Sequence, residues 1–450
     1  MVRTADIQKL KHQFLPSDAV ITHWESLEPY FKTLLATELN SVEVLEKWLR
    51  NLSELEAFIS EDACWRQIKM TCDTSDASLE EAFNYFCMEI QPKIQPYADA
   101  LNKKLIACPF TKDLDPSTYF TYLRSVKKSI ELFREENIPI QAELSVLQQQ
   151  YGVIAGKMTI DFQGQEYTLQ QAAQFLENPD RSIREEVYLK IQERRSQDQT
   201  TLHDLFTNLI QKRNQVALNA GFNNYRDYKF QELGRFDYTK EDCYQFHEAI
   251  KLHVLPLIDK IYERKKKKLG VDTLRPWDTE AVPLNTKPLQ PFTDGQDLYN
   301  KSVSCFEKLN PFFADCLRKM NELKHFDLES RKSKAPGGYN CPLAESGAPF
   351  IFMNAAGLDP LLCDTLEFAA LIEAAGGDFE LHVHEGVQQR HDNQRYVEIC
   401  SLRPALRGEG VYSARRLGGV GDSGNGPAWD VGDAGDVHGE KRRCQRADRH

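Results

Sequence analysis

Two segments decide the β part of the fold: KAPGGY at residues 334–339 and APFIFMNAAGL at residues 348–358. Gly337 and Gly338 follow a proline and suit a turn in which the backbone comes close to its neighbours, because glycine has no Cβ. The apolar run that starts at Phe350 is short and is typical of a buried strand. The sequence therefore predicts a turn that leads into a small β element.

Elsewhere the apolar residues recur at three- and four-residue spacing, which is typical of amphipathic helices. Asn40 or Ser41 is expected to cap one helix start, and acidic residues follow Pro179 at another. A hairpin is expected over residues 158–168, with its turn at Gln163-Gly164. The expected helical regions are residues 27–107, 116–136, a stretch ending near Leu269 and closed by Gly270, 296–309 and 311–323. The fold class is therefore mainly α with a small β element.

Composition excludes several classes of partner. The chain has 450 residues and a net charge of −11, which argues against nucleic acid, since phosphate binding requires a basic face. No stretch is long and apolar enough to cross a bilayer, and the first residues hold no apolar leader segment. The 11 cysteines are scattered singly, so we expect reduced thiols and a cytoplasmic protein without a membrane partner.

The composition changes after residue 358. Residues 1–334 hold 29 lysines, whereas the only later lysine is Lys441. Residues 401–450 hold ten of the 24 glycines and no Ile, Phe, Met or Thr. A segment of this kind buries little apolar surface, so it is expected to be disordered or aberrant. A genuine low-complexity tail is one interpretation, and a changed reading frame is the one that we favour.

The sequence offers few metal ligands. A catalytic zinc helix places two histidines four residues apart, with a glutamate between them as general base, and no pair of histidines in this chain has that spacing. His384 and His391 are seven residues apart, which is about 10.5 Å along a helix and too far to share one metal ion. His382 and His384 could share a metal from a strand, where alternate residues face one side. These three histidines are the weak candidates for metal ligands.

Four further segments carry a resemblance. Residues 143–152, 219–230, 234–238 and 274–278 occur in this order ahead of the two segments quoted first. Taken together, they are similar to the thimet/oligoendopeptidase-F family of zinc metallopeptidases, over roughly residues 110–358. For the aromatic segment 219–230 two interpretations stay open: a helix stop and turn with packed rings, or a cleft wall that contributes to peptide binding.

The resemblance implies a large helical zincin-type oligopeptidase shell around a deep cleft, a zinc cofactor and short peptide substrates. The strand at residues 348–354 would lie at the cleft and pair with an extended peptide, as in strand addition. The implied substrate-binding residues are Gly337, Gly338, Phe350, Phe352 and Asn354. An ordinary buried strand is the other interpretation of the Phe350–Phe352 run, and the two are compatible.

No catalytic residue can be assigned, because the family's His-Glu-x-x-His helix does not follow Asn354 in this chain. The first hypothesis is a zinc-dependent oligoendopeptidase whose sequence is truncated or frame-disrupted, so that its catalytic core is incomplete and this chain is inactive. The second is a non-catalytic helical peptide-binding or scaffold protein. The expected domains are an N-terminal helical region (1–110), a helical lobe with a hairpin (111–185), the start of a catalytic domain (186–358) and an aberrant or disordered tail (359–450).

Overall fold

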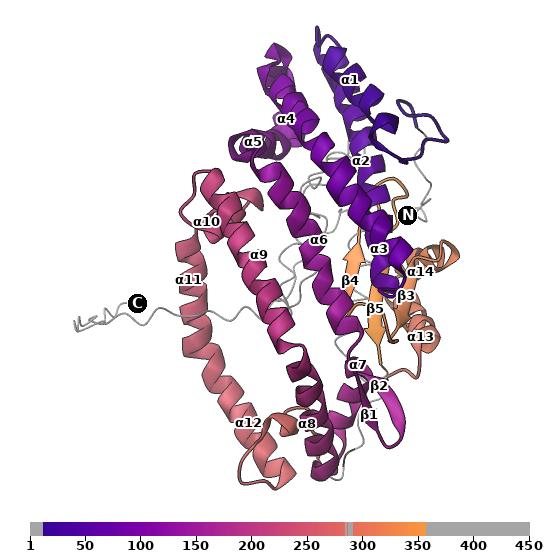
Figure 1. Ribbon diagram of the computed structural model, residues 1–450, viewed down its shortest axis with the longest axis vertical. Helices are drawn as coiled ribbons and strands as arrows, with labels where there is room; N and C mark the ends of the chain where they lie inside the picture. Colours follow the sequence, from indigo (N-terminus) through magenta and orange to yellow (C-terminus); the bar gives the residue numbers. More distant parts are fainter. Residues whose placement is uncertain (1–11, 284–285, 287–290, 357–450) are drawn as a thin grey trace, which may run out of the picture.

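The computed structural model describes residues 12–283, 286 and 291–356. This part of the chain is mostly helical, with two small sheets (Figure 1). Its first half contains η1 (Trp24–Ser26), α1 (Glu28–Ala36), α2 (Val42–Cys72), α3 (Ala77–Tyr85), η2 (Phe86–Ile90), α4 (Gln91–Ala107), η3 (Pro109–Asp113), α5 (Pro116–Leu132) and α6 (Asn137–Gly156). The mainly α fold class predicted from the sequence is confirmed.

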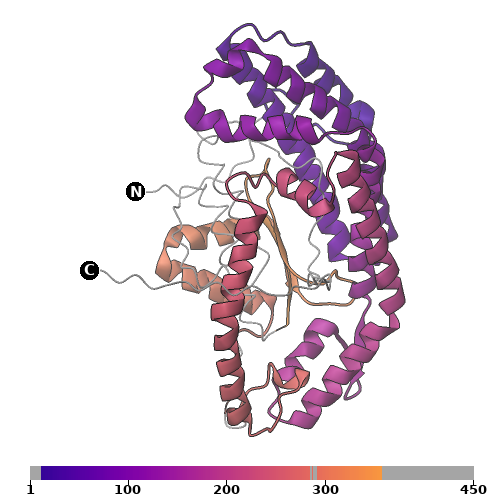
Figure 2. The ribbon, with the colours of Figure 1, turned by 90° about the vertical axis from the view of Figure 1, so that its left-hand side faces the viewer.

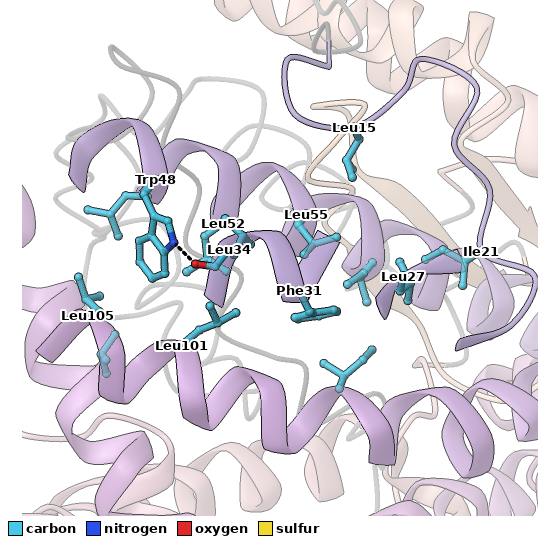
Figure 3. Packing of buried hydrophobic residues seen from close by; sticks show 14 of the residues in the cluster. Leu15, Ile21, Leu27, Phe31, Leu34, Trp48, Leu52, Leu55, Leu101 and Leu105 are labelled. Carbon is cyan, nitrogen blue, oxygen red and sulfur yellow. Dashed lines mark hydrogen bonds between the residues drawn. The ribbon is translucent and has the colours of Figure 1, made fainter. Parts of the chain in front are cut away.

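The N-terminal helices enclose one large core. Side chains of α1, α2 and α4 pack together there, among them Phe31, Leu52 and Leu101 (Figure 3). Trp48 is 1% exposed, and its indole Nε1 donates to the carbonyl of Leu34 at 2.9 Å, so its only polar atom is satisfied. Burial of each such side chain contributes about 1.5–3 kcal/mol, which makes this core a rigid base for the rest of the chain.

The middle of the chain consists of long helices and one hairpin. The elements are β1 (Thr159–Phe162), β2 (Gln165–Thr168), α7 (Leu169–Ala173), η4 (Gln174–Glu177), α8 (Arg181–Gln197), α9 (Gln199–Asn219), α10 (Tyr225–Glu232), α11 (Lys240–Ala249), η5 (Ile250–Val254), α12 (Leu255–Leu269) and η6 (Pro276–Asp278). In Figure 2 the helices up to α9 form a curved wall, and the second sheet lies within its curve.

The second sheet contains β3 (Phe326–Glu329), β4 (Tyr339–Cys341) and β5 (Phe350–Ala355) in the order β3-β5-β4. β5 runs parallel to β3 and antiparallel to β4. Helices α13 (Gly295–Leu309) and α14 (Pro311–Glu322) cover one face through Ile351 and Met353. The C-terminal part of α2 covers the other face through Phe350 and Phe352. Burial on both faces explains why this strand is a continuous apolar run rather than an alternating one.

Several local predictions are confirmed. Ser41 caps α2, and the hairpin turns at Gln163 and Gly164. α8 begins after Pro179 as expected, but its acidic residue at the start is the N-cap Asp180, and its first turn holds none. α12 ends at Leu269, and Gly270 follows in the left-handed conformation with φ 65°. The helix expected over residues 116–136 is shorter, because α5 ends at Leu132 and α6 already begins at Asn137. Pro139 fits inside α6 because the first turn of a helix needs no N–H donor there.

No helix in the described residues is both long and apolar enough to cross a bilayer. The predicted disordered or aberrant tail and the histidines His382, His384 and His391 lie outside the described residues.

Candidate functional site

The edge strand β4 is the first component of the candidate site. β5 has a partner on each side, so β4 and β3 form the two edges of the sheet. Gly295, the first residue of α13, packs closely on β3, since a Cβ there would come within 3.0 Å of the Leu328 Cβ. Among the described strands, β4 pairs only with β5. β4 is therefore an edge strand, the position in a sheet at which an added strand pairs.

The structure narrows the expectation for residues 348–354. The strand is present as β5, which pairs with β3 on one side and, over Phe350–Phe352, with β4 on the other. Phe350 is 5% exposed, Phe352 0% and Asn354 6%. β5 is thus the central strand of the sheet over Phe350–Phe352, where both neighbours leave no edge for a peptide; peptide pairing at Met353 and Asn354 stays a prediction. The sequence did not show this, because an apolar run indicates burial but not which strands flank it.

The glycine pair shapes the entry into β4. Gly337 has φ 88°, a conformation that favours glycine. A Cβ on Gly338 would lie 3.3 Å from the carbonyl oxygen of Phe352, so the turn lies close to β5. Asn354 Nδ2 donates to the carbonyls of Ala335 and Gly337, at 2.8 Å in each case. Two of the predicted residues therefore form the turn, and a third fixes it from β5.

Tyr339 joins β4 to both β5 and α2. Its ring stacks on Phe352 with a centroid separation of 4.6 Å and an interplanar angle of 6°. Its hydroxyl lies 2.6 Å from the hydroxyl of Thr71 in α2. Burial raises the pKa of Tyr339 well above its usual value, so the phenol stays neutral at every physiological pH. These contacts fix β4 against β5 and against α2.

A buried lysine, which the sequence analysis did not single out, lies where β3 pairs with β5. The β3–β5 pairing shifts register between Asp327 and Glu329. The ammonium of Lys334 fills this interruption and donates to the carbonyls of Asp327 (3.0 Å), Glu329 (2.8 Å) and Met353. It also contacts the Asp327 carboxylate at 2.8 Å and lies 4.5 Å from the Phe352 ring centroid. Its side chain is 0% exposed.

The positive charge of Lys334 lies beside the negative charge of Asp327. Burial lowers the pKa of Lys334, and the hydrogen bond and attraction to Asp327 oppose that shift. Burial alone would raise the pKa of Asp327, but hydrogen bonds from Arg331, Cys72 and Lys334 outweigh it and hold the value at about 2. An ammonium ion has three donors and no acceptor. The four acceptors around Lys334 Nζ therefore share its three N–H groups. The only sequence signal for this role was the position of Lys334 two residues before the Pro-Gly-Gly turn.

The loop between β4 and β5 is held by two more groups. Glu61 in α2 accepts from the backbone N–H groups of Glu345 and Ser346 at 2.8 Å each. His325 is 5% exposed and lies edge-on to Trp65, and its Nδ1 is 3.2 Å from the carbonyls of Ala348 and Pro349. Burial lowers the pKa of His325, so its ring is neutral and acts as a structural support.

A zinc ion is the cofactor that the resemblance implies. In residues 12–283, 286 and 291–356, no three histidine, cysteine, aspartate or glutamate side chains are grouped so that they could hold a metal ion. The described donor sets therefore do not fit zinc, and the three candidate histidines lie beyond them. What the described residues build is a supported strand edge, which can hold an extended main chain through hydrogen bonds.

Comparisons with known proteins agree with this architecture. Three solved structures share the fold: "PZ PEPTIDASE A with inhibitor 2" (24% identity, TM-score 0.72), a putative oligoendopeptidase F from Bacillus anthracis str. Ames (23%, 0.73) and another putative oligoendopeptidase F (24%, 0.72). Each match covers 78% of this chain, but the chain spans only 62–64% of the length of these proteins. No curated protein sequence matches the chain.

Two family models match the sequence itself. The Peptidase M3 N-terminal domain matches residues 14–133, and Peptidase family M3 matches residues 174–367. Together they cover more than half of the chain; the second includes the sheet, and the first includes α2, which supports it. The chain belongs to peptidase family M3.

Proposed function

We propose that this chain provides the scaffold of a zinc-dependent oligoendopeptidase and that the edge of β4 binds the main chain of a short, extended peptide. The observation that carries the proposal is the position of β4 (Tyr339–Cys341) at the edge of the sheet in a member of peptidase family M3. Main-chain pairing gives affinity with little dependence on sequence. That property suits an enzyme that acts on many short peptides.

The predicted substrate-binding residues take different parts in this proposal. Gly337 and Gly338 form the turn that leads into β4, and the missing Cβ of Gly338 lets this turn lie against β5. Phe350, Phe352 and Asn354 act from beneath, because they are buried and contact the turn or β4 rather than the open edge. Strand addition is sensitive to the position of the edge, so this support contributes to affinity.

We propose further that the chain as written binds peptides without hydrolysing them. It holds no pair of histidines at the zincin spacing, and a single histidine does not fix zinc for catalysis. If the chain binds zinc at all, His382, His384 and His391 are the first residues to replace. The cytoplasmic location stays a proposal as well, and the free thiols of the described cysteines support it.

The test has two arms. The first measures binding of a fluorescent pentapeptide and of the same peptide N-methylated at alternate amides, which removes main-chain donors. Pairing at β4 predicts weaker binding of the methylated peptide by about tenfold, because each lost hydrogen bond contributes about 1 kcal/mol. Equal affinity for both peptides would contradict strand addition.

The second arm measures hydrolysis of a quenched fluorescent peptide with added zinc. No turnover is expected from the 450-residue chain. Turnover that phenanthroline abolishes would show that the chain has a working metal site, and replacement of His382, His384 and His391 by Ala would then locate it.

Two further observations separate the enzyme from the non-catalytic scaffold. A source nucleotide sequence that encodes His-Glu-x-x-His in another frame after codon 358 would support the enzyme. One tightly bound zinc per purified chain, measured by elemental analysis, would exclude the metal-free scaffold.

A further inference from the structure

A pocket of about 1060 Å³ lies between α5 and α10, and none of its lining residues belongs to the sheet. One wall is the exposed side of α5, and the other is α10 with the loop that leads to α11. The two helices lie side by side in Figure 1. The aromatic segment 219–230, which the sequence analysis left open between ring packing and a cleft wall, contributes Phe222 and Phe230 to this pocket.

The two walls are clamped by Arg124. Its guanidinium makes two hydrogen bonds to the carboxylate of Asp237 in the loop, at 2.9 and 3.2 Å. The same group lies between two rings, 5.5 Å from the centroid of Phe120 and 4.6 Å from that of Phe236. Bidentate pairing and aromatic stacking together fix the loop against α5. The pocket is therefore formed before any ligand binds.

The pocket is basic although the whole chain is acidic. Six basic and two acidic side chains line it, whereas the net charge of the chain is −11. Lys128 and Lys240 already pair with the two acidic ones. The guanidinium of Arg235 lies 5.7 Å from the Phe230 ring centroid, and no carboxylate of the described residues pairs with it or with Lys112 or Lys127. A guanidinium without a carboxylate partner beside an aromatic ring favours a ligand that is anionic and partly apolar.

We propose that this pocket binds the carboxylate of a short peptide, with Arg235 as its main partner and the aromatic rings in contact with a neighbouring apolar side chain. The proposal rests on the proposed peptide binding for the class of ligand, and it adds a requirement for a peptide carboxylate, from an acidic side chain or from the C-terminus. A guanidinium presents a planar pair of donors that matches a carboxylate. A pocket of this size accommodates a few peptide residues.

The experiment measures fluorescence anisotropy with the labelled tetrapeptide Leu-Phe-Asp-Leu. Four forms are compared, with Asp or Asn at the third position and with a free or an amidated C-terminus. Loss of the carboxylate that the pocket binds is expected to weaken binding about tenfold, as for the loss of one charge-assisted hydrogen bond. The form that loses affinity tells whether the side chain or the C-terminus is bound. Affinity should also fall as salt is added.

Variants locate the effect. Arg235→Gln should weaken binding of the carboxylate peptide about tenfold and leave its uncharged form unchanged, and Arg235→Lys should recover part of the loss. The matched control is Arg195→Gln on α8, an exposed arginine outside the pocket, which should bind as the wild type does. Thermal unfolding of each variant checks that the fold is retained.

The outcomes separate this inference from the proposed function. Equal affinity for all four peptides, or wild-type affinity in Arg235→Gln, overturns the carboxylate pocket. If N-methylation still weakens binding in that case, peptide pairing at β4 stands without the pocket. Loss of affinity on removal of the carboxylate, with no effect of N-methylation, supports the pocket and counts against pairing at β4. Neither arm depends on hydrolysis.

Discussion

At the scale of single residues, Lys334 does the most to hold the site. Its ammonium has four acceptors and no exposed surface. Lys334→Met keeps most of the side-chain volume but leaves three carbonyls without this donor, whereas the Asp327 carboxylate keeps its pair with Arg331. Each buried acceptor that loses its donor costs about 1–3 kcal/mol, so urea unfolding should show a loss of roughly 3 kcal/mol or more. The control is Lys332→Met, whose exposed pair with Glu166 contributes less than about 1 kcal/mol.

Asp327 gives a prediction for the dependence of stability on pH. Its folded pKa of about 2 lies below the ordinary value of 3.8, so ionisation stabilises the folded state. This contribution is fully present above the unfolded pKa and is lost as the pH falls through the folded pKa, from about pH 4 to about pH 2. Its size is roughly 2 kcal/mol. Unfolding free energies of the wild type and Asp327→Asn should therefore converge as the pH is lowered, and a constant difference would contradict this account.

At the scale of elements, the turn before β4 links sequence to site. Gly337 has φ 88°, and an alanine there costs about 1–2 kcal/mol. Gly337→Ala should therefore lower stability and also weaken peptide binding, because the turn sets the position of β4. Gly164→Ala is the matched control: it has φ 80° in the β1–β2 turn, with nothing near its Cβ position. It should lose similar stability and keep the wild-type affinity in the anisotropy measurement.

Helix caps and turns, which depend on residues close in sequence, could be predicted. Which elements pack or pair with each other could not. Caps such as Ser41 and the Gln163-Gly164 turn depend on residues close in sequence, and the structure confirms them. The strand at Phe350 was also predicted, but its central position depends on β3 and β4, which pair with it from elsewhere in the chain. The Lys334 contacts depend on the same pairing, so periodicity alone could not predict them.

At the scale of the whole molecule, the helical segment from α11 to α12 buries none of its side chains. Many of these side chains are nevertheless apolar. The large exposed ones are Tyr244, Phe246, Leu252, Leu255, Leu257, Ile261 and Tyr262. Exposed apolar side chains in this number promote association between copies of a protein. We therefore expect the purified chain to self-associate in a concentration-dependent way.

The double variant Leu252→Gln, Leu257→Gln tests this expectation. Both side chains are more than half exposed, at 64% and 55%, so their replacement should change the unfolding free energy by less than about 0.5 kcal/mol each. Sedimentation velocity should show a lower share of large species than in the wild type. Leu209→Gln on α9, where the leucine is 8% exposed, should instead lower stability by more than about 1 kcal/mol, since it buries an amide in an apolar cluster. If the double variant loses as much stability as Leu209→Gln, the surface of α11 and α12 is part of the core of the folded chain, and the self-association must have another origin.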